Sequence, residues 1–170
     1  MLKVFDVRLT EILGDRHLDV LLPMPKDELE AKIKKALGEK EYFVDVIDKH
    51  GLNITEYTSI FALNDFAQFI YDSTIEESVL EAITECGESE LDSVKDVVEN
   101  EKYCIIETQI TLEDEETCLG YALYENNLLD EELPEELVSK GYIDFNSIGR
   151  DYSIRYGWKE TKHNTFCRTW

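Results

Sequence analysis

Residues 59–99 read SIFALNDFAQFIYDSTIEESVLEAITECGESELDSVKDVVE and contain three helical patterns in succession. In the first pattern Ile60, Leu63, Ala67 and Ile70 recur at intervals of 3, 4 and 3 residues, which is the spacing of one buried helix face. Short helices such as these are marginally stable in isolation. We therefore expect the three helices to pack on one another.

The second and third patterns are shorter than the first. The sequence TIEE at 74–77 has the form of a capping box, in which Thr74 and Glu77 satisfy each other's free backbone N–H groups. The apolar stripe that follows consists of Ile75, Val79, Ala82, Ile83 and Cys86. A third helix is expected to begin within SELD at 89–92. Its inward-facing residues are predicted to be Leu91, Val94 and Val98.

Upstream of the helices, the sequence predicts a small sheet with one helix. Apolar residues alternate with polar ones, or form short apolar runs, at 2–10, 18–23 and 42–48. Between the second and third of these strands, Pro25 opens a helix that runs to Leu37 and stops at Gly38. We expect this part of the chain to end near Tyr57.

Downstream, the pattern returns to a mixture of strands and helices. YCIIETQI at 103–110 predicts a strand, and Thr111 is placed to cap a helix whose first turn, 113–116, is four consecutive acids. Short helical pieces follow within 133–152, and 154–170 is expected to form a hairpin. The fold class predicted from the whole chain is therefore α+β.

The chain is strongly acidic, and the acidity is unevenly distributed. It carries 38 Asp and Glu against 17 Lys and Arg, a formal net charge of -21. Residues 41–139 hold 27 acidic and 3 basic side chains, whereas 1–40 holds 8 of each and 140–170 holds 3 acidic and 6 basic. A surface this acidic repels phosphate, which disfavours binding to nucleic acid or to an anionic membrane and favours a cationic groove as partner. The segregation argues against a general halophile-type surface.

The acids of the second and third helices fall into two rows. The first row is Glu77, Glu81, Glu85 and Glu88, and the second is Asp92, Asp96 and Glu99. Like charges at this spacing destabilise a helix by about 0.2–0.5 kcal/mol per pair. The rows are either ordinary solvated faces or an ordered display of anions kept at a cost in stability. In the second case, 21 charges match roughly 36 Å of duplex DNA, and the carboxylates stand in for phosphates.

Several segments of the sequence resemble the ArdA antirestriction proteins of conjugative elements. They are EYTSIFALNDFAQFI at 56–70, ENEKYCI at 99–105, LEDEETCLGYALYE at 112–125, LPEELVSKGYIDFNSIGRD at 133–151 and LDVLLPMPKDELEAKI at 18–33. The most specific of these pieces is YIDFNSIGRD. The opening of the chain departs from the Gly-rich, aromatic opening of that family, so no first-domain surface residue is transferred from it.

The resemblance implies an elongated homodimer of three small domains, here 1–58, 59–101 and 102–170. It implies inhibition of type I restriction-modification enzymes through occupation of the DNA-binding groove of their specificity and modification subunits. It assigns phosphate mimicry to the two acidic rows and to further acids in the last third of the chain, namely Glu113, Asp114, Glu115, Glu116, Asp130, Glu131, Glu132, Glu135 and Glu136. It also places an antirestriction motif near 128–142, close to the dimer contact.

The sequence offers little for catalysis, and we expect no enzyme activity, cofactor or metal site. It lacks a dinucleotide fingerprint, a P-loop, HExxH and GxSxG, and His163 with Cys167 has no second pair of metal ligands nearby. The four cysteines contain no CxxC and are expected to be free thiols. With no apolar run long enough to span a membrane and no signal peptide, the protein is expected to be cytoplasmic.

Two rival functions remain open at this point. The first is an acidic inhibitor or adaptor for another basic nucleic-acid-binding protein, such as a CRISPR effector, which the co-purifying partner would distinguish. The second is a metal-dependent hydrolase that uses clustered carboxylates, which calorimetry with calcium, magnesium and manganese would distinguish.

Overall fold

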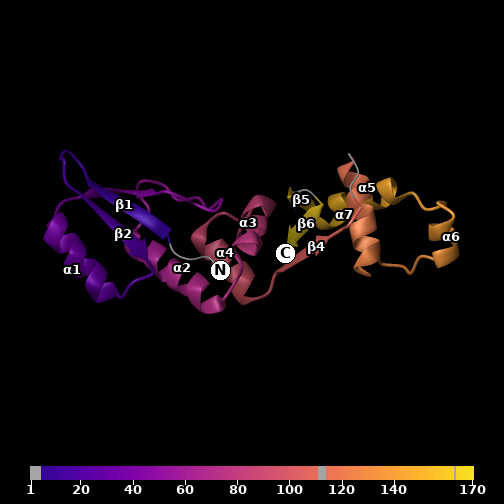
Figure 1. Cartoon of the computed structure of the whole chain (residues 1–170), viewed down its shortest axis with the longest axis horizontal. Helices are drawn as coiled ribbons and strands as arrows, with labels where there is room; N and C mark the ends of the chain where they lie inside the picture. The colour runs from indigo at the N-terminus through magenta and orange to yellow at the C-terminus, as the bar shows by residue number, and fades with distance from the viewer. Residues whose placement is uncertain (1–4, 111–113, 163) are drawn as a thin grey trace.

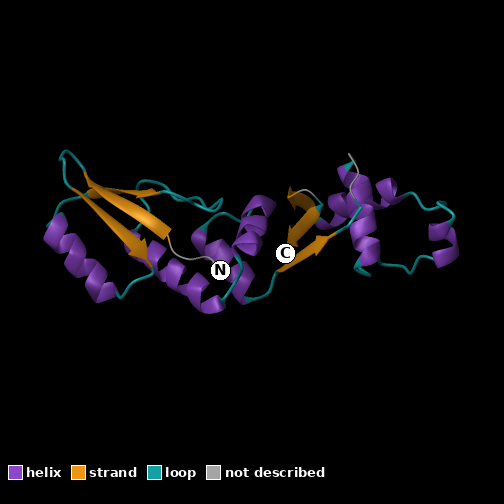
Figure 2. Cartoon of the chain, in the orientation of Figure 1, coloured by secondary structure: helices purple, strands orange, loops and turns teal. Residues whose placement is uncertain are grey.

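The computed structural model describes residues 5–110, 114–162 and 164–170. Within these ranges the chain forms seven helices and two three-stranded antiparallel sheets, as the predicted α+β class requires. The elements follow one another along one long axis, and the chain then turns back from the α6 end to finish in the second sheet (Figure 1). The two sheets lie in separate parts of the molecule (Figure 2). No helix of the described residues is long and apolar enough to cross a membrane.

The first sheet has β1 at its centre. Its strands are β1 (Phe5–Glu11), β2 (His17–Leu22) and β3 (Tyr42–Val46), in the order β2-β1-β3. Alternate residues of β1 are buried, as a sheet with one solvated face requires. On the solvated face Arg8 forms a bidentate ion pair with Asp19 across the β1–β2 register. The three predicted strands are confirmed.

Helix α1 (Lys26–Ala36) covers the buried face of this sheet. Its inward residues Leu29 and Ile33 belong to the same hydrophobic core as the strands. Acids occupy its first turn and lysines its last turn, which complements the helix dipole. The chain leaves the helix through Gly38, which adopts φ +72. The prediction of a helix that ends at Gly38 is confirmed.

Three helices follow: α2 (Ile60–Ser73), α3 (Glu77–Cys86) and α4 (Leu91–Glu99). All four residues of the predicted α2 face are buried, namely Ile60, Leu63, Ala67 and Ile70. In α3 the fully buried Leu80 joins the predicted stripe, in which Val79 is only half-buried. In α4 it is Val97 rather than Val98 that reaches the core beside Val94.

The predicted capping box at 74–77 is wrong. Thr74 is the left-handed residue that ends α2, with φ 56, and the N-cap of α3 is Glu76, whose side chain makes no capping bond. The physical reason is the short connection between the two helices. The chain must reverse direction between Ser73 and Glu77, so Thr74 is used to end one helix and cannot cap the next.

One hydrophobic core joins the first sheet to all three of these helices. It includes Phe5 and Leu9 of β1, Leu63 of α2, Leu80 of α3 and Val94 of α4. Side chains on either side of residue 58 therefore pack in the same core. The division into 1–58 and 59–101 stays a prediction about chain organisation.

The second half of the chain is built from the second sheet and three more helices. The strands are β4 (Tyr103–Glu107), β5 (Lys159–Lys162) and β6 (Thr165–Thr169), in the order β4-β6-β5. The helices are α5 (Glu115–Glu125), α6 (Glu135–Ser139) and α7 (Phe145–Tyr156). The strand predicted over 103–110 stops at Glu107, and the hairpin predicted from 154 starts later because α7 continues to Tyr156.

Helices α5 and α7 lie against each other through glycine. Gly120 of α5 and Gly149 of α7 are buried, and each faces backbone atoms of the opposite helix. Beside them, the Phe145 ring stacks on the Tyr121 ring with 4.0 Å between centroids. Gly149 belongs to the YIDFNSIGRD stretch, so this motif has a packing role.

Both of these helices are capped by aspartate. Asp114 accepts hydrogen bonds from the backbone N–H and the hydroxyl of Thr117, and Asp144 does the same with Ser147. The predicted cap residue of α5, Thr111, lies outside the described residues, and the cap of this helix is Asp114. The bonds from Ser147 hold the pKa of Asp144 below its usual range, the backbone N–H having the larger effect.

The Asp144 cap makes a testable contribution to acid stability. Because the pKa of Asp144 is lower in the folded chain, its contribution is present above about pH 4 and is lost as the pH falls through the folded-state value. Asp144→Asn keeps a capping oxygen but cannot titrate. We expect the variant to lose less stability than the parent between neutral and acidic pH, measured by urea unfolding at each pH. Parallel pH profiles would contradict this role.

Candidate functional site

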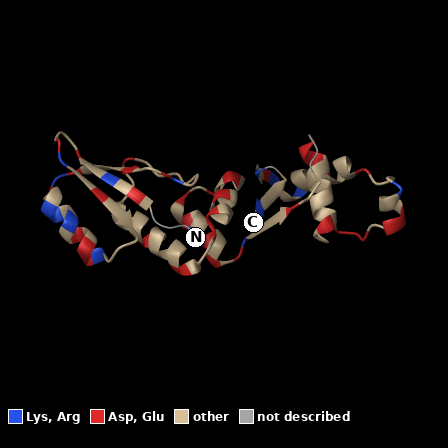
Figure 3. Ribbon diagram, in the orientation of Figure 1, with Lys and Arg blue, Asp and Glu red and all other residues tan. Residues whose placement is uncertain are grey.

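The candidate site is an acidic surface that extends over α3, α4, α5 and α6. Acidic residues occur on these helices along the long axis, whereas basic residues occur mainly on α1, where they alternate with acids, and in the second sheet (Figure 3). We use the name acidic surface for the predicted acids that the structure describes: Glu77, Glu81, Glu85, Glu88, Asp92, Asp96, Glu99, Asp114, Glu115, Glu116, Asp130, Glu131, Glu132, Glu135 and Glu136. The remaining predicted acid, Glu113, lies outside the described residues.

On α3 the predicted row is only partly exposed to solvent. Glu77 and Glu85 are exposed, whereas Glu81 is half-buried, with its Oε2 2.5 Å from the Nζ of Lys162 in β5. Glu88 was expected on the same helix but lies beyond it, because the helix ends at Cys86 and Gly87 turns the chain. The row on α3 is therefore three carboxylates long, and one of them is neutralised by the terminal hairpin.

On α4 all three predicted acids are exposed. The Nζ of Lys102 lies 2.7 Å from Asp96 Oδ2, and this contact lowers the pKa of Asp96. Glu99 pairs more loosely with Lys95, at 3.8 Å. Asp92 is the acid of this helix with no ion pair among the described residues.

The acids at the start of α5 have local structural roles as well as charge. Asp114 caps the helix and also accepts a hydrogen bond from Asn146 at the start of α7, at 2.7 Å. The hydrogen bonds from Thr117 and Asn146 lower the pKa of Asp114, in that order of importance. Glu115 accepts a bond from the backbone N–H of Glu160 at 3.4 Å. Hydrogen bonds therefore hold the carboxylates of Asp114 and Glu115 in place.

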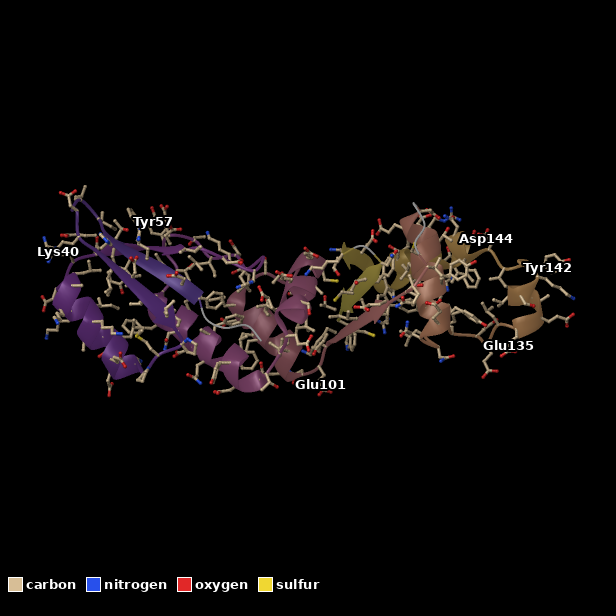
Figure 4. The ribbon with its side chains drawn as sticks, in the orientation of Figure 1. Lys40, Tyr57, Glu101, Glu135, Tyr142 and Asp144 are labelled. Atoms are coloured by element: carbon tan, nitrogen blue, oxygen red, sulfur yellow. The ribbon has the colours of Figure 1, made fainter. Side chains whose placement is uncertain are left out.

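Acids at the end of α5, in the loop that follows and at the start of α6 surround a hollow. Glu125, Glu131, Glu132 and Glu135 line a cavity of about 650 Å³ together with Tyr124 and neighbouring residues. Figure 4 shows Glu135 at the end of the molecule farthest from α1. No cation of the described residues pairs with these four carboxylates. The hollow is thus suited to a guanidinium or ammonium group from another molecule.

Two groups of acids can be separated by their contacts within the described residues. Those that lie within 4.0 Å of a basic nitrogen are Glu77, Glu81, Asp96, Glu99 and Glu136. Those without such a contact are Glu85, Glu88, Asp92, Asp114, Glu115, Glu116, Asp130, Glu131, Glu132 and Glu135. Most of the second group comes from the part of the chain between Lys102 and Lys140, where the sequence has no basic residue.

Sequence reasoning missed the packing of the basic hairpin against α3. Lys159 donates to the carbonyl of Cys86 at 2.7 Å, and Cys86 donates through its thiol to the carbonyl of Cys167 at 3.0 Å. Ala82, Cys86 and Cys167 form a small buried cluster at this contact. The only sequence signal was the change of charge sign near residue 140, which indicates complementary parts but not their contact. As expected, all four cysteines are free.

The chain matches a known protein family. A family model described as antirestriction protein (ArdA) matches residues 15–166. None of the curated proteins searched matches the chain.

Proposed function

The chain belongs to the ArdA antirestriction protein family, and we propose that it engages its target through the acidic surface. Membership makes it an antirestriction protein, a DNA mimic that inhibits type I restriction-modification enzymes, and not an enzyme itself. The proposal concerns the contacts through which this chain carries out that inhibition.

The observation that carries the proposal is the run of carboxylates without basic neighbours along the long axis. Duplex DNA presents one negative charge per about 1.7 Å of its axis, and a groove that binds it is lined with Lys and Arg. Carboxylates on α3, α4 and α5 and beside α6 offer the same sign of charge in a fixed arrangement. Competition with DNA then follows, because both ligands bind the same Lys and Arg side chains of the groove.

We assign phosphate mimicry to the predicted acids, including Glu113. The strongest support is for Glu85, Asp92, Glu131, Glu132 and Glu135, which are exposed and form no ion pair within 4.0 Å in the described residues. Glu81 has weaker support because it is already neutralised by Lys162. The acidic hollow between the end of α5 and the start of α6 would receive a Lys or Arg side chain of the target.

We further propose that the chain has small domains at 1–58, 59–101 and 102–170 and that it forms a homodimer. We also propose that it acts in the cytoplasm on the specificity and modification subunits of the restriction-modification enzyme. The antirestriction motif is placed near 128–142, close to the dimer contact. Leu137 and Tyr142 support this assignment, because both are large apolar or aromatic residues exposed near α6 (Figure 4).

Competition binding tests the proposal directly. The protein should displace duplex DNA from a purified type I methyltransferase core, and displacement should weaken steeply as salt rises. Displacement that is indifferent to ionic strength would contradict the electrostatic model.

A single charge removal should have little effect. Glu85→Gln is expected to change the concentration needed for half-displacement by less than about threefold, because each contact is one of many. Glu81→Gln provides the matched comparison on the same helix, since its carboxylate already pairs with Lys162. Complete loss of inhibition in Glu85→Gln would indicate a localised site in place of a distributed surface.

A further inference from the structure

A second site lies where the loop after β3 meets the first turn of α3. Asp48, His50 and Glu77 each offer one ligand atom here, and these atoms all lie within 4.8 Å of one another. Two of the residues come from the loop, and Glu77 is the first residue of α3. The site therefore joins two segments that are 27 residues apart in sequence.

The backbone and its neighbours fix the position of His50. Its φ is 47, in the left-handed region, its N–H donates to Asp48 Oδ1 at 3.0 Å, and its carbonyl accepts from Thr84 Oγ1 at 3.0 Å. The ring lies against Phe5, with 5.9 Å between centroids, and only 8% of the side chain is exposed. A non-glycine residue in this conformation is uncommon.

The buried Nδ1 atom of His50 has no hydrogen-bond partner among the described residues. It points into the cluster, 3.3 Å from Glu77 Oε1 and 3.6 Å from Asp48 Oδ1. Buried polar atoms without a partner are rare and call for an explanation such as a missing ion. For tetrahedral ligands at about 2.0–2.2 Å from Zn²⁺, adjacent ligand atoms are about 3.3–3.6 Å apart. The two measured separations match this spacing.

We propose that Asp48, His50 and Glu77 bind a divalent transition-metal ion of the Zn²⁺ class. Imidazole nitrogen and carboxylate oxygen are both zinc donors, and a water molecule can supply the fourth ligand of a tetrahedral site. Ca²⁺ and Mg²⁺ prefer all-oxygen sites and fit this set less well. This inference departs from the expectation of no metal that the sequence alone supported.

Bound metal would have two consequences for the protein. It would link the loop after β3 to the start of α3, and it would offset two carboxylate charges at one end of the acidic surface.

Calorimetry on the chelator-stripped full-length protein tests the proposal, with ZnCl₂ titrated at physiological ionic strength. We expect one saturable Zn²⁺ site per chain, a rise in melting temperature on Zn²⁺ addition, and no comparable response to Mg²⁺. Glu77→Gln should weaken the site at least tenfold, and we expect the variant to fold because Glu77 is exposed. His50→Asn, chosen because Asn tolerates the left-handed region, should abolish the site and the melting-temperature response.

Glu76→Gln is the matched control, because Glu76 is exposed and adjacent to the site but outside the cluster. It should bind Zn²⁺ like the parent. The readout is independent of inhibition, so the outcome does not depend on the proposed contacts with the restriction enzyme. Unchanged Zn²⁺ affinity in both Glu77→Gln and His50→Asn, or only weak, unsaturable binding that salt suppresses, would overturn the proposal.

Discussion

Gly149→Ala is expected to destabilise the second half of the protein by about 3 kcal/mol or more. A Cβ atom at Gly149 would lie 1.8 Å from the carbonyl oxygen of Glu116 and 2.9 Å from the backbone N of Gly120. These are backbone atoms of α5 and cannot rotate away, so the two helices must separate. Separation would also disturb the stack of Phe145 on Tyr121.

Urea unfolding followed by tryptophan fluorescence measures this effect, because Trp158 and Trp170 both lie in the second half of the chain. Gly157→Ala, at the residue that ends α7, is the matched control in the same half of the chain. Its Cβ would meet no atom within 4 Å, so its cost is limited to the left-handed backbone, about 1–2 kcal/mol. Equal destabilisation by the two variants would contradict the close helix contact.

Gly120→Ala examines the same contact from the other helix. Its Cβ would lie 2.1 Å from the carbonyl oxygen of Phe145. Because both substitutions force the same pair of helices apart, the double variant should be less destabilised than the sum of the two single variants.

Neutralising four acids together is expected to reduce inhibition by about one to two orders of magnitude at physiological salt. The set is Glu85→Gln, Asp92→Asn, Glu131→Gln and Glu135→Gln, one or two from each region of the acidic surface. All four side chains are exposed and none has an ion pair among the described residues, so the fold should persist. The loss should be accompanied by a weaker dependence of displacement on salt, because fewer counterions are released.

A control of equal charge separates this effect from net charge. Asp15→Asn, Glu30→Gln, Glu39→Gln and Glu41→Gln remove four exposed acids from the first part of the chain, outside the acidic surface. DNA displacement from the methyltransferase core should stay close to that of the parent. If both sets weaken inhibition equally, the total charge rather than the proposed surface governs binding.

Local sequence patterns predicted the elements well wherever one periodicity dominated. The α2 face from Ile60 to Ile70 and the stop at Gly38 are found as expected, because burial of one face and a left-handed glycine leave direct sequence signals. The capping box failed because Thr74 ends α2 in the left-handed conformation and so cannot cap α3, and a local motif does not show to which helix a residue belongs.

The sequence likewise predicted only part of the candidate site. The sequence alone established the number, sign and segregation of the charges, and the resemblance to the family followed from contiguous motifs. It could not show that Glu81 faces Lys162, which is 81 residues away, nor that His50 meets Glu77. The first of these pairings shows which carboxylate of α3 is already neutralised within the chain.

Periodicity and charge are properties of neighbouring residues, so the sequence by itself determined the acidic helices and the α+β class. It also predicted that the partner presents a positively charged surface. Only the tertiary structure decided that α5 and α7 touch through glycine, that the basic hairpin packs against α3, and that three ligand atoms converge at His50. The physical reason is that such contacts depend on how distant segments pack, and many arrangements of the same elements satisfy the same local pattern.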